Sequence, residues 1–138
     1  MFITKRVEFS ASHVCRNPDL SDSRNSEIFG SAANPHGHGH NYEVEVTLEG
    51  APDPVTGMVL DLKDLKEILQ REILEPYDHR FLNEEVAPFD RVVPTVENIA
   101  IDIWRRLEPR FQGVRGKLHR VRVYETSDLY ADYFGDAN

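Results

Sequence analysis

The chain has 138 residues, of which 40% are hydrophobic and 29% charged, an ordinary globular composition with enough length for a core. Its formal net charge of −8 and pI near 5.2 argue against a nucleic-acid partner, because no broad basic surface can form. The chain has one cysteine, which excludes an intramolecular disulfide, and it has no signal-peptide core or membrane-length apolar run. We therefore expect a protein of the cytoplasm without a membrane partner. Its length predicts a single domain over residues 1–138.

The N-terminal segment alternates between apolar and polar residues. Over residues 2–13, Val7, Phe9 and His13 share one parity while charged and hydroxyl residues take the other. This period of two predicts a half-buried strand. Residues 16–37 are polar and rich in Asn, Asp, Ser, Pro and Gly, and we predict a long loop of functional importance there.

A second alternating segment covers residues 38–49. His38 and His40 share a parity with Val44 and Val46, whereas the intervening positions are mostly acidic. The pattern predicts a second strand whose first two inward-facing side chains are imidazoles.

Two helices are predicted in the middle of the chain. After a turn at 51–57 and a short return strand at Met58–Leu60, Asp61 can cap a helix over about 62–74 that Pro76 stops. A second helix begins near Thr95 and ends at Pro109.

The remaining segments complete the fold prediction. Residues 117–125 alternate again, and 129–134 can form a closing strand. Strands at both ends with helices between them indicate an α+β fold, a four-stranded antiparallel sheet with two helices on one face. The other face and the edges of such a sheet are open, so we expect an oligomer.

Three histidines form the strongest candidate site. His38 and His40 point to the same side of their strand, and His13 ends the first strand on its apolar parity. Two adjacent strands can bring the three imidazoles together, and three histidines with an open fourth position are typical of catalytic Zn²⁺. A purely structural zinc site is the alternative, and His36 is not needed as a ligand.

Carboxylates mark two further candidate sites. Glu125 ends an inward-facing row with Val121 and Val123, where an unpaired carboxylate is costly and a ligand with N–H donors would satisfy it. Asp78 precedes His79 and can orient its imidazole for proton transfer. Taken locally, Asp78-His79 reads as a surface dipeptide, and Thr95 and Glu97 read as the cap and first-turn acid of a helix.

Together these residues resemble the 6-pyruvoyl-tetrahydropterin synthase family, which includes the 6-carboxytetrahydropterin synthases of queuosine biosynthesis. The resemblance covers nearly the whole chain and is most specific in FSASH (9–13) and HGHNY (38–42). The long loop and the DPVTGM turn are more similar to the pyruvoyl-type enzymes of biopterin synthesis. Further matching segments are FG (29–30), NPHG (34–37), DPVTGMV (53–59), YDHRF (77–81), TVEN (95–98) and VYET (123–126).

The resemblance implies the tunnelling fold, in which trimers close their sheets into a barrel and two trimers stack into a homohexamer with active sites between subunits. It implies 7,8-dihydroneopterin triphosphate as substrate and Zn²⁺ as cofactor. The implied roles, by residue, are metal binding by His13, His38 and His40, proton relay by Asp78 and His79, pterin binding by Glu125, and a pocket-lining segment that holds Thr95 and Glu97.

One position departs from the family pattern. Pyruvoyl-type members read FGxCxNPxGHGHNY, with the cysteine as general base, whereas this chain has Ala32 there. Four explanations stay open: a deliberate Cys→Ala replacement, a different base such as His79, Glu27 or His36, the thiol of Cys15, or pterin binding without turnover.

The predicted function is therefore a zinc-dependent lyase that eliminates triphosphate from the pterin, with nonstandard or blocked proton abstraction. The alternatives are a 6-carboxytetrahydropterin synthase, a homologue that cleaves the dihydroneopterin side chain, and a non-catalytic pterin-binding paralogue.

Overall fold

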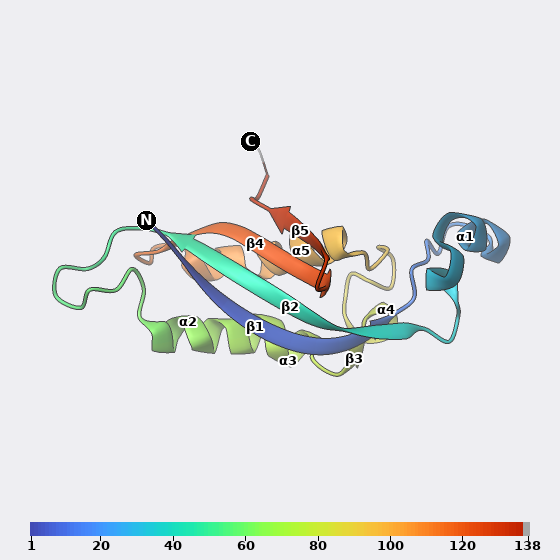
Figure 1. Cartoon of the computed structure of the whole chain (residues 1–138), viewed down its shortest axis with the longest axis horizontal. Coiled ribbons are helices and arrows are strands. Elements are labelled where there is room, and N and C mark those ends of the chain that lie inside the picture. Colours follow the sequence, from blue (N-terminus) through green and yellow to red (C-terminus); the bar gives the residue numbers. More distant parts are fainter. Residues whose placement is uncertain (137–138) are drawn as a thin grey trace.

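A computed structural model describes residues 1–136 and contains one five-stranded sheet in the order β3-β1-β2-β4-β5 (Figure 1). The strands are β1 (Phe2–His13), β2 (His38–Glu49), β3 (Arg80–Phe81), β4 (Lys117–Thr126) and β5 (Leu129–Tyr133). The prediction of a four-stranded antiparallel sheet is wrong in one respect, because β3 adds a fifth strand that pairs parallel to β1. A strand of two residues is too short to produce an alternation that the sequence could reveal.

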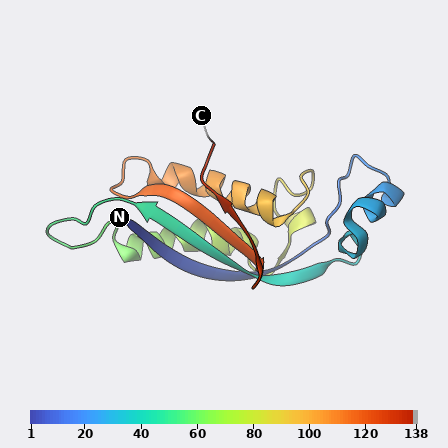
Figure 2. The same ribbon diagram turned by 45° about the horizontal axis from the view of Figure 1, so that its top comes forward.

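The helices that follow β2 pack on one face of the sheet (Figures 1 and 2). The two main ones are α2 (Leu62–Leu69) and α5 (Val96–Leu107), as the α+β prediction expects. Asp61 and Thr95 cap them, each accepting a hydrogen bond from a backbone N–H of the first turn. Smaller helical segments are the π-helical turn Gln70–Leu74, α3 (Glu75–Tyr77), α4 (Leu82–Glu85) and the 3-10 turn Glu108–Phe111.

Pro76 does not stop the first of these helices. A π-helical turn over Gln70–Leu74 continues α2 into α3, and Pro76 lies in the first turn of α3. A proline ring clashes with the carbonyl four residues earlier in a regular helix, and the wider π turn changes that spacing. The predicted return strand at Met58–Leu60 is also absent, since these residues form an irregular bend.

The predicted loop at 16–37 contains a helix, α1 (Asp22–Phe29), followed by a 3-10 turn at Gly30–Ala33. The helix lies at one end of the molecule, beyond the sheet (Figure 1). Ser21 caps it, and buried Asn25 donates to the carbonyls of Asn17 and Leu20. Its polar sequence lacks an apolar stripe, so periodicity could not reveal it.

The core lies between the sheet and the helices. Inward-facing side chains of β1, β2 and β4 meet the apolar stripes of α2 and α5, and this packing fixes the side of the sheet on which the imidazoles point. The largest fully buried side chains are Tyr42, Tyr77, Phe9, Phe89, Leu48, Leu65, Leu69, Ile73, Leu82, Ile99, Ile103 and Leu107.

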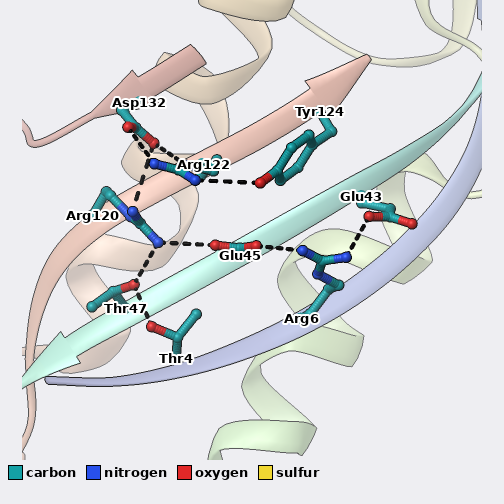
Figure 3. Close-up of polar contacts among 9 residues, drawn as sticks. All are labelled: Thr4, Arg6, Glu43, Glu45, Thr47, Arg120, Arg122, Tyr124 and Asp132. Atoms are coloured by element: carbon teal, nitrogen blue, oxygen red, sulfur yellow. Dashed lines mark hydrogen bonds and ion pairs between the residues drawn. The ribbon is translucent and has the colours of Figure 1, made fainter. Parts of the chain in front are cut away.

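The opposite face of the sheet is polar and carries a network of ion pairs (Figure 3). Glu45 of β2 accepts hydrogen bonds from Arg6 of β1 at 2.6 Å and from Arg120 of β4 at 2.9 Å. Asp132 of β5 is held by both Nε and Nη2 of Arg122, at 2.7 and 2.9 Å. Cross-strand pairs therefore neutralise the arginines of this face.

None of the helices within residues 1–136 combines the length and apolar character that crossing a lipid bilayer requires.

Candidate metal and substrate site

Three imidazoles converge where β1 ends and β2 begins. The antiparallel register places His13 directly opposite His38 and Ala11 opposite His40. The Nε2 atoms of His13 and His38 are 3.1 Å apart, and one nitrogen from each of the three rings lies within 4.8 Å of the others. The alternation along two paired strands thus produces the cluster that the sequence predicts.

His13 is the most firmly held of the three. Its ring is 0% exposed, and its Nδ1–H donates to the carbonyl of Pro94 at 2.8 Å. Burial lowers the pKa of His13 to about 4, so the ring is neutral near pH 7. With the proton on Nδ1, the Nε2 lone pair faces His38, which is the tautomer a metal ligand requires.

His40 supplies the observation that tests whether a metal fits. Its Nε2 is buried and has no hydrogen-bond partner among the described residues, and burial lowers the pKa of His40. The nearest carboxylate oxygen, Oε1 of Glu125, is 3.6 Å away. Three converging imidazole nitrogens, of which that of His40 is buried and without a partner among the described residues, are a donor set that could hold a divalent metal ion.

Glu125 lies at the end of β4, beside the imidazoles, with 19% of its side chain exposed. Its negative charge adds to burial in raising the pKa values of Cys15 and Tyr42. The structure therefore places a partly exposed carboxylate next to the histidine cluster.

Thr95 is the N-cap of α5, and Glu97 lies in the first turn of this helix. Thr95 accepts from the backbone N–H of Asn98 at 3.2 Å, so its hydroxyl serves as the helix cap, and Glu97 is exposed. The start of α5 nevertheless borders the cluster through the carbonyl of Pro94. Sequence reasoning missed that carbonyl, because no sequence pattern shows a contact between residues 81 positions apart.

Asp78 and His79 lie at the β3 side of β1. Asp78 Oδ1 accepts from the backbone N–H of Ser10 at 2.9 Å, and its Oδ2 is 3.1 Å from Nδ1 of His79. The His79 ring is 82% exposed. His40 and His79 border the same open cavity of about 610 Å³, together with Ser12, Asn41 and Arg80.

Ala32 borders a cavity together with His38, and it also contacts Cys15, one of the alternative bases. The backbone N–H of Cys15 donates to the carbonyl of Ala32 at 2.9 Å, and burial raises the pKa of the Cys15 thiol to about 11. Glu27 is exposed and paired with Arg24 at 2.7 Å, while His36 is exposed in the turn before β2. The thiol thus keeps its proton near pH 7, and Glu27 faces away from the core.

Comparisons with known proteins agree with this geometry. The family model described as "PTPS: 6-pyruvoyl tetrahydropterin synthase" matches residues 2–136. The chain is 44% identical to the 6-pyruvoyl tetrahydrobiopterin synthase of Homo sapiens over 134 residues, which cover 97% of this chain and 91% of the human protein.

Two further relatives are similar over most of the chain. The solved structure of the Caenorhabditis elegans 6-pyruvoyl tetrahydropterin synthase superposes with a TM-score of 0.92 and 37% identity, covering 99% of this chain and 96% of that one. A putative 6-carboxy-5,6,7,8-tetrahydropterin synthase of Archaeoglobus fulgidus is 40% identical over 95 residues, 69% of this chain and 73% of the relative.

Proposed function

Because the chain belongs to the 6-pyruvoyl tetrahydropterin synthase family, we propose that it is a zinc-dependent lyase that eliminates triphosphate from 7,8-dihydroneopterin triphosphate. The observation that carries the proposal is the cluster of His13, His38 and His40 beside the carboxylate of Glu125. The cluster offers three imidazole nitrogen ligands, and the carboxylate offers a hydrogen-bond acceptor for a planar heterocycle.

His13, His38 and His40 would hold Zn²⁺ through ring nitrogens and leave a fourth position for the substrate. The ion supplies Lewis acidity toward the hydroxyl groups of the substrate side chain when bound. Glu125 accepts hydrogen bonds from the amino and ring N–H groups of the pterin, which orients the side chain toward the imidazoles. In this proposal Thr95 and Glu97, at the start of α5, contribute to binding the pterin.

Among the alternatives for the base that Ala32 leaves open, His79 has the best support. Its imidazole is exposed, is oriented by Asp78 at 3.1 Å and borders the same cavity as His40. The ion pair of Glu27 with Arg24 and the raised pKa of Cys15 weigh against those two groups. In this proposal His79 removes the side-chain proton and Asp78 stabilises the imidazolium that results.

A homohexamer of two trimers completes the proposal. Beyond Ala11 and Ser12, the outer edge of β1 pairs with no strand of residues 1–136, and β5 forms the opposite edge of the sheet. Pairing of these two edges between neighbouring copies would close the sheets into a barrel and place the cavity beside β1, which His40 and His79 border, near the junction between copies.

Incubation of the zinc-loaded protein with 7,8-dihydroneopterin triphosphate tests the function. We expect triphosphate release with the 6-pyruvoyl product, abolished in His79→Ala and retained in Cys15→Ser. Release of an aldehyde, or formation of a 6-carboxy product, would instead assign side-chain cleavage or carboxypterin synthesis. Tight binding without any product would assign the non-catalytic binder that Ala32 favours.

A further inference from the structure

We propose that Tyr77, Asp102 and Arg106 form a clamp that positions the Asp78-His79 dipeptide for proton transfer, an inference that rests on the function proposed above. Tyr77 is fully buried, and its hydroxyl donates to Oδ2 of Asp102. Arg106 donates from Nε to the same oxygen at 2.7 Å, and its guanidinium lies 5.3 Å from the centre of the Tyr77 ring. The tyrosine ends α3, whereas the two charged residues lie one turn apart on α5.

The clamp is a largely buried polar cluster. Apolar side chains in the same place would carry no desolvation penalty. The Asp102 side chain is 13% exposed, so its charge depends on the two donors that reach it. Burial and the charge of Asp102 raise the pKa of Tyr77 well above its usual value, and the phenol therefore stays a donor. A buried carboxylate that needs both partners allows one arrangement of α3 against α5, rather than a set of sliding contacts.

The dipeptide beyond the clamp is held in an unfavourable backbone conformation. His79 has φ of +60°, a left-handed value that residues with a Cβ rarely adopt. Its N–H donates to the carbonyl of Ser10 at 2.6 Å, while the N–H of Ser10 donates to Asp78. Such a conformation persists only where the surroundings fix it from several sides, and β1 provides one of them.

The clamp holds the Asp78-His79 backbone from a second side. Tyr77 is the residue immediately before Asp78, and Arg106 also donates from Nη2 to the carbonyl of Ala87 at 2.8 Å. The cluster therefore secures both ends of the segment 78–87 to α5. Since the His79 ring is 82% exposed, little packing orients it, and its direction depends on the backbone that the clamp and β1 hold.

Tyr77→Phe in the zinc-loaded protein tests the clamp, because it removes the hydroxyl and keeps the ring. We expect kcat to fall about 10- to 100-fold with KM within about twofold, since a displaced proton acceptor slows the reaction without changing pterin binding. Zinc content should not change, and the backbone N–H of His79 should exchange with deuterium about tenfold faster. The double variant Tyr77→Phe/Asp102→Asn should be no slower than Asp102→Asn alone.

Glu67→Gln is the matched control, because it removes an ion pair with Arg71 one turn away on the exposed side of α2 and should leave both readouts unchanged. If Tyr77→Phe fails to fold, Arg106→Lys tests the same link through the contact with Ala87. Unchanged exchange at His79 overturns the clamp, even if kcat falls. An inactive parent protein overturns the proposed function alone, and the exchange of His79 then still decides the clamp.

Discussion

At the scale of residues, the three imidazoles are held to different degrees. His13 is enclosed and tied to the chain just before α5, whereas His38 and His40 are partly buried at the start of β2. His13 therefore serves the fold as well as the site, because the Pro94 carbonyl loses its partner without it. The two glycine-flanked histidines can be changed with less damage to the core.

The first prediction concerns His38. His38→Ala should reduce bound zinc from about one ion per chain by at least about tenfold while the far-ultraviolet circular dichroism stays unchanged, because one of three ligands is lost. Metal analysis by mass spectrometry after dialysis provides the measurement. His36→Ala is the control, since this exposed histidine lies two residues earlier and should keep its zinc. Equal loss in both variants would contradict the ligand assignment.

The second prediction concerns Ala32. Ala32→Cys should accelerate triphosphate release about 100-fold, because a thiol there restores a base beside the cluster, and a positioned base contributes a factor of that order. Initial rates at saturating substrate provide the measurement. Ala33→Cys controls for adding a thiol one residue along the chain. A reactive thiol at position 32 with no gain in rate would show that the missing base is not what limits this protein.

At the scale of elements, the sequence predicted the strands and helices that have a periodic apolar pattern and missed the elements that have none. The alternation in residues 2–13 and 38–49 gave both long strands, and the capped apolar stripes gave α2 and α5. The same parity argument placed His38 and His40 on the inner face and Glu125 at the end of an inner row. These features are local, so a single sequence contains them.

The missed elements depend on specific contacts rather than on a periodic pattern. β3 exists through two residues that pair with β1, and α1 is stabilised by a cap and by buried Asn25. Helix formation through Pro76 requires a π-helical turn that no composition rule signals. The clamp between Tyr77 and α5 likewise joins residues 25 positions apart. Tertiary contacts account for β3 and for the clamp, whereas α1 and the π-helical turn depend on local side-chain and backbone geometry that periodicity does not reveal.

The third prediction concerns β5 and acid. Hydrogen bonds from Arg122 lower the pKa of Asp132, so its contribution to stability is complete above the ordinary value of 3.8 and is lost as pH falls through the lower folded value. Asp132→Asn should therefore lower the urea midpoint near pH 7, and the difference from the parent should shrink below about pH 4.

Asp90→Asn serves as the comparison for this acid series, because Asp90 is exposed and its nearest cation, on Arg91, is 3.9 Å away. Its urea midpoint should match that of the parent protein at every pH. A constant difference between Asp132→Asn and the parent down to pH 2 would contradict the assigned ionic contribution.

At the scale of the whole molecule, the sheet presents a polar face and two open edges. The apolar face is covered by helices, whereas the other carries Arg6, Glu45 and Arg120 in cross-strand pairs (Figure 3). A ring of such sheets would turn charged, hydrated side chains toward its axis. The edges would be satisfied by hydrogen bonds between copies instead of being left available for aggregation.

The fourth prediction concerns this assembly. Light scattering during size-exclusion chromatography should give six times the 15.9 kDa of one chain, and dilution into the nanomolar range should not release monomers if strand edges are paired. Activity should fall in step with any loss of the hexamer, because the proposed active sites lie between subunits. A fully active monomer would contradict both the barrel and the shared site.

The hydrogen bond between Cys15 and Ala32 gives the molecule an internal reporter. Cys15 is the sole thiol of the chain, and it is buried where the segment after β1 meets the turn before β2. A water-soluble disulfide dye can therefore reach it only during moments when these two segments separate. The half-time of labelling therefore reports how often the two segments separate, and no engineered probe is needed. Slower labelling in the presence of pterin would show that the bound pterin keeps the two segments together.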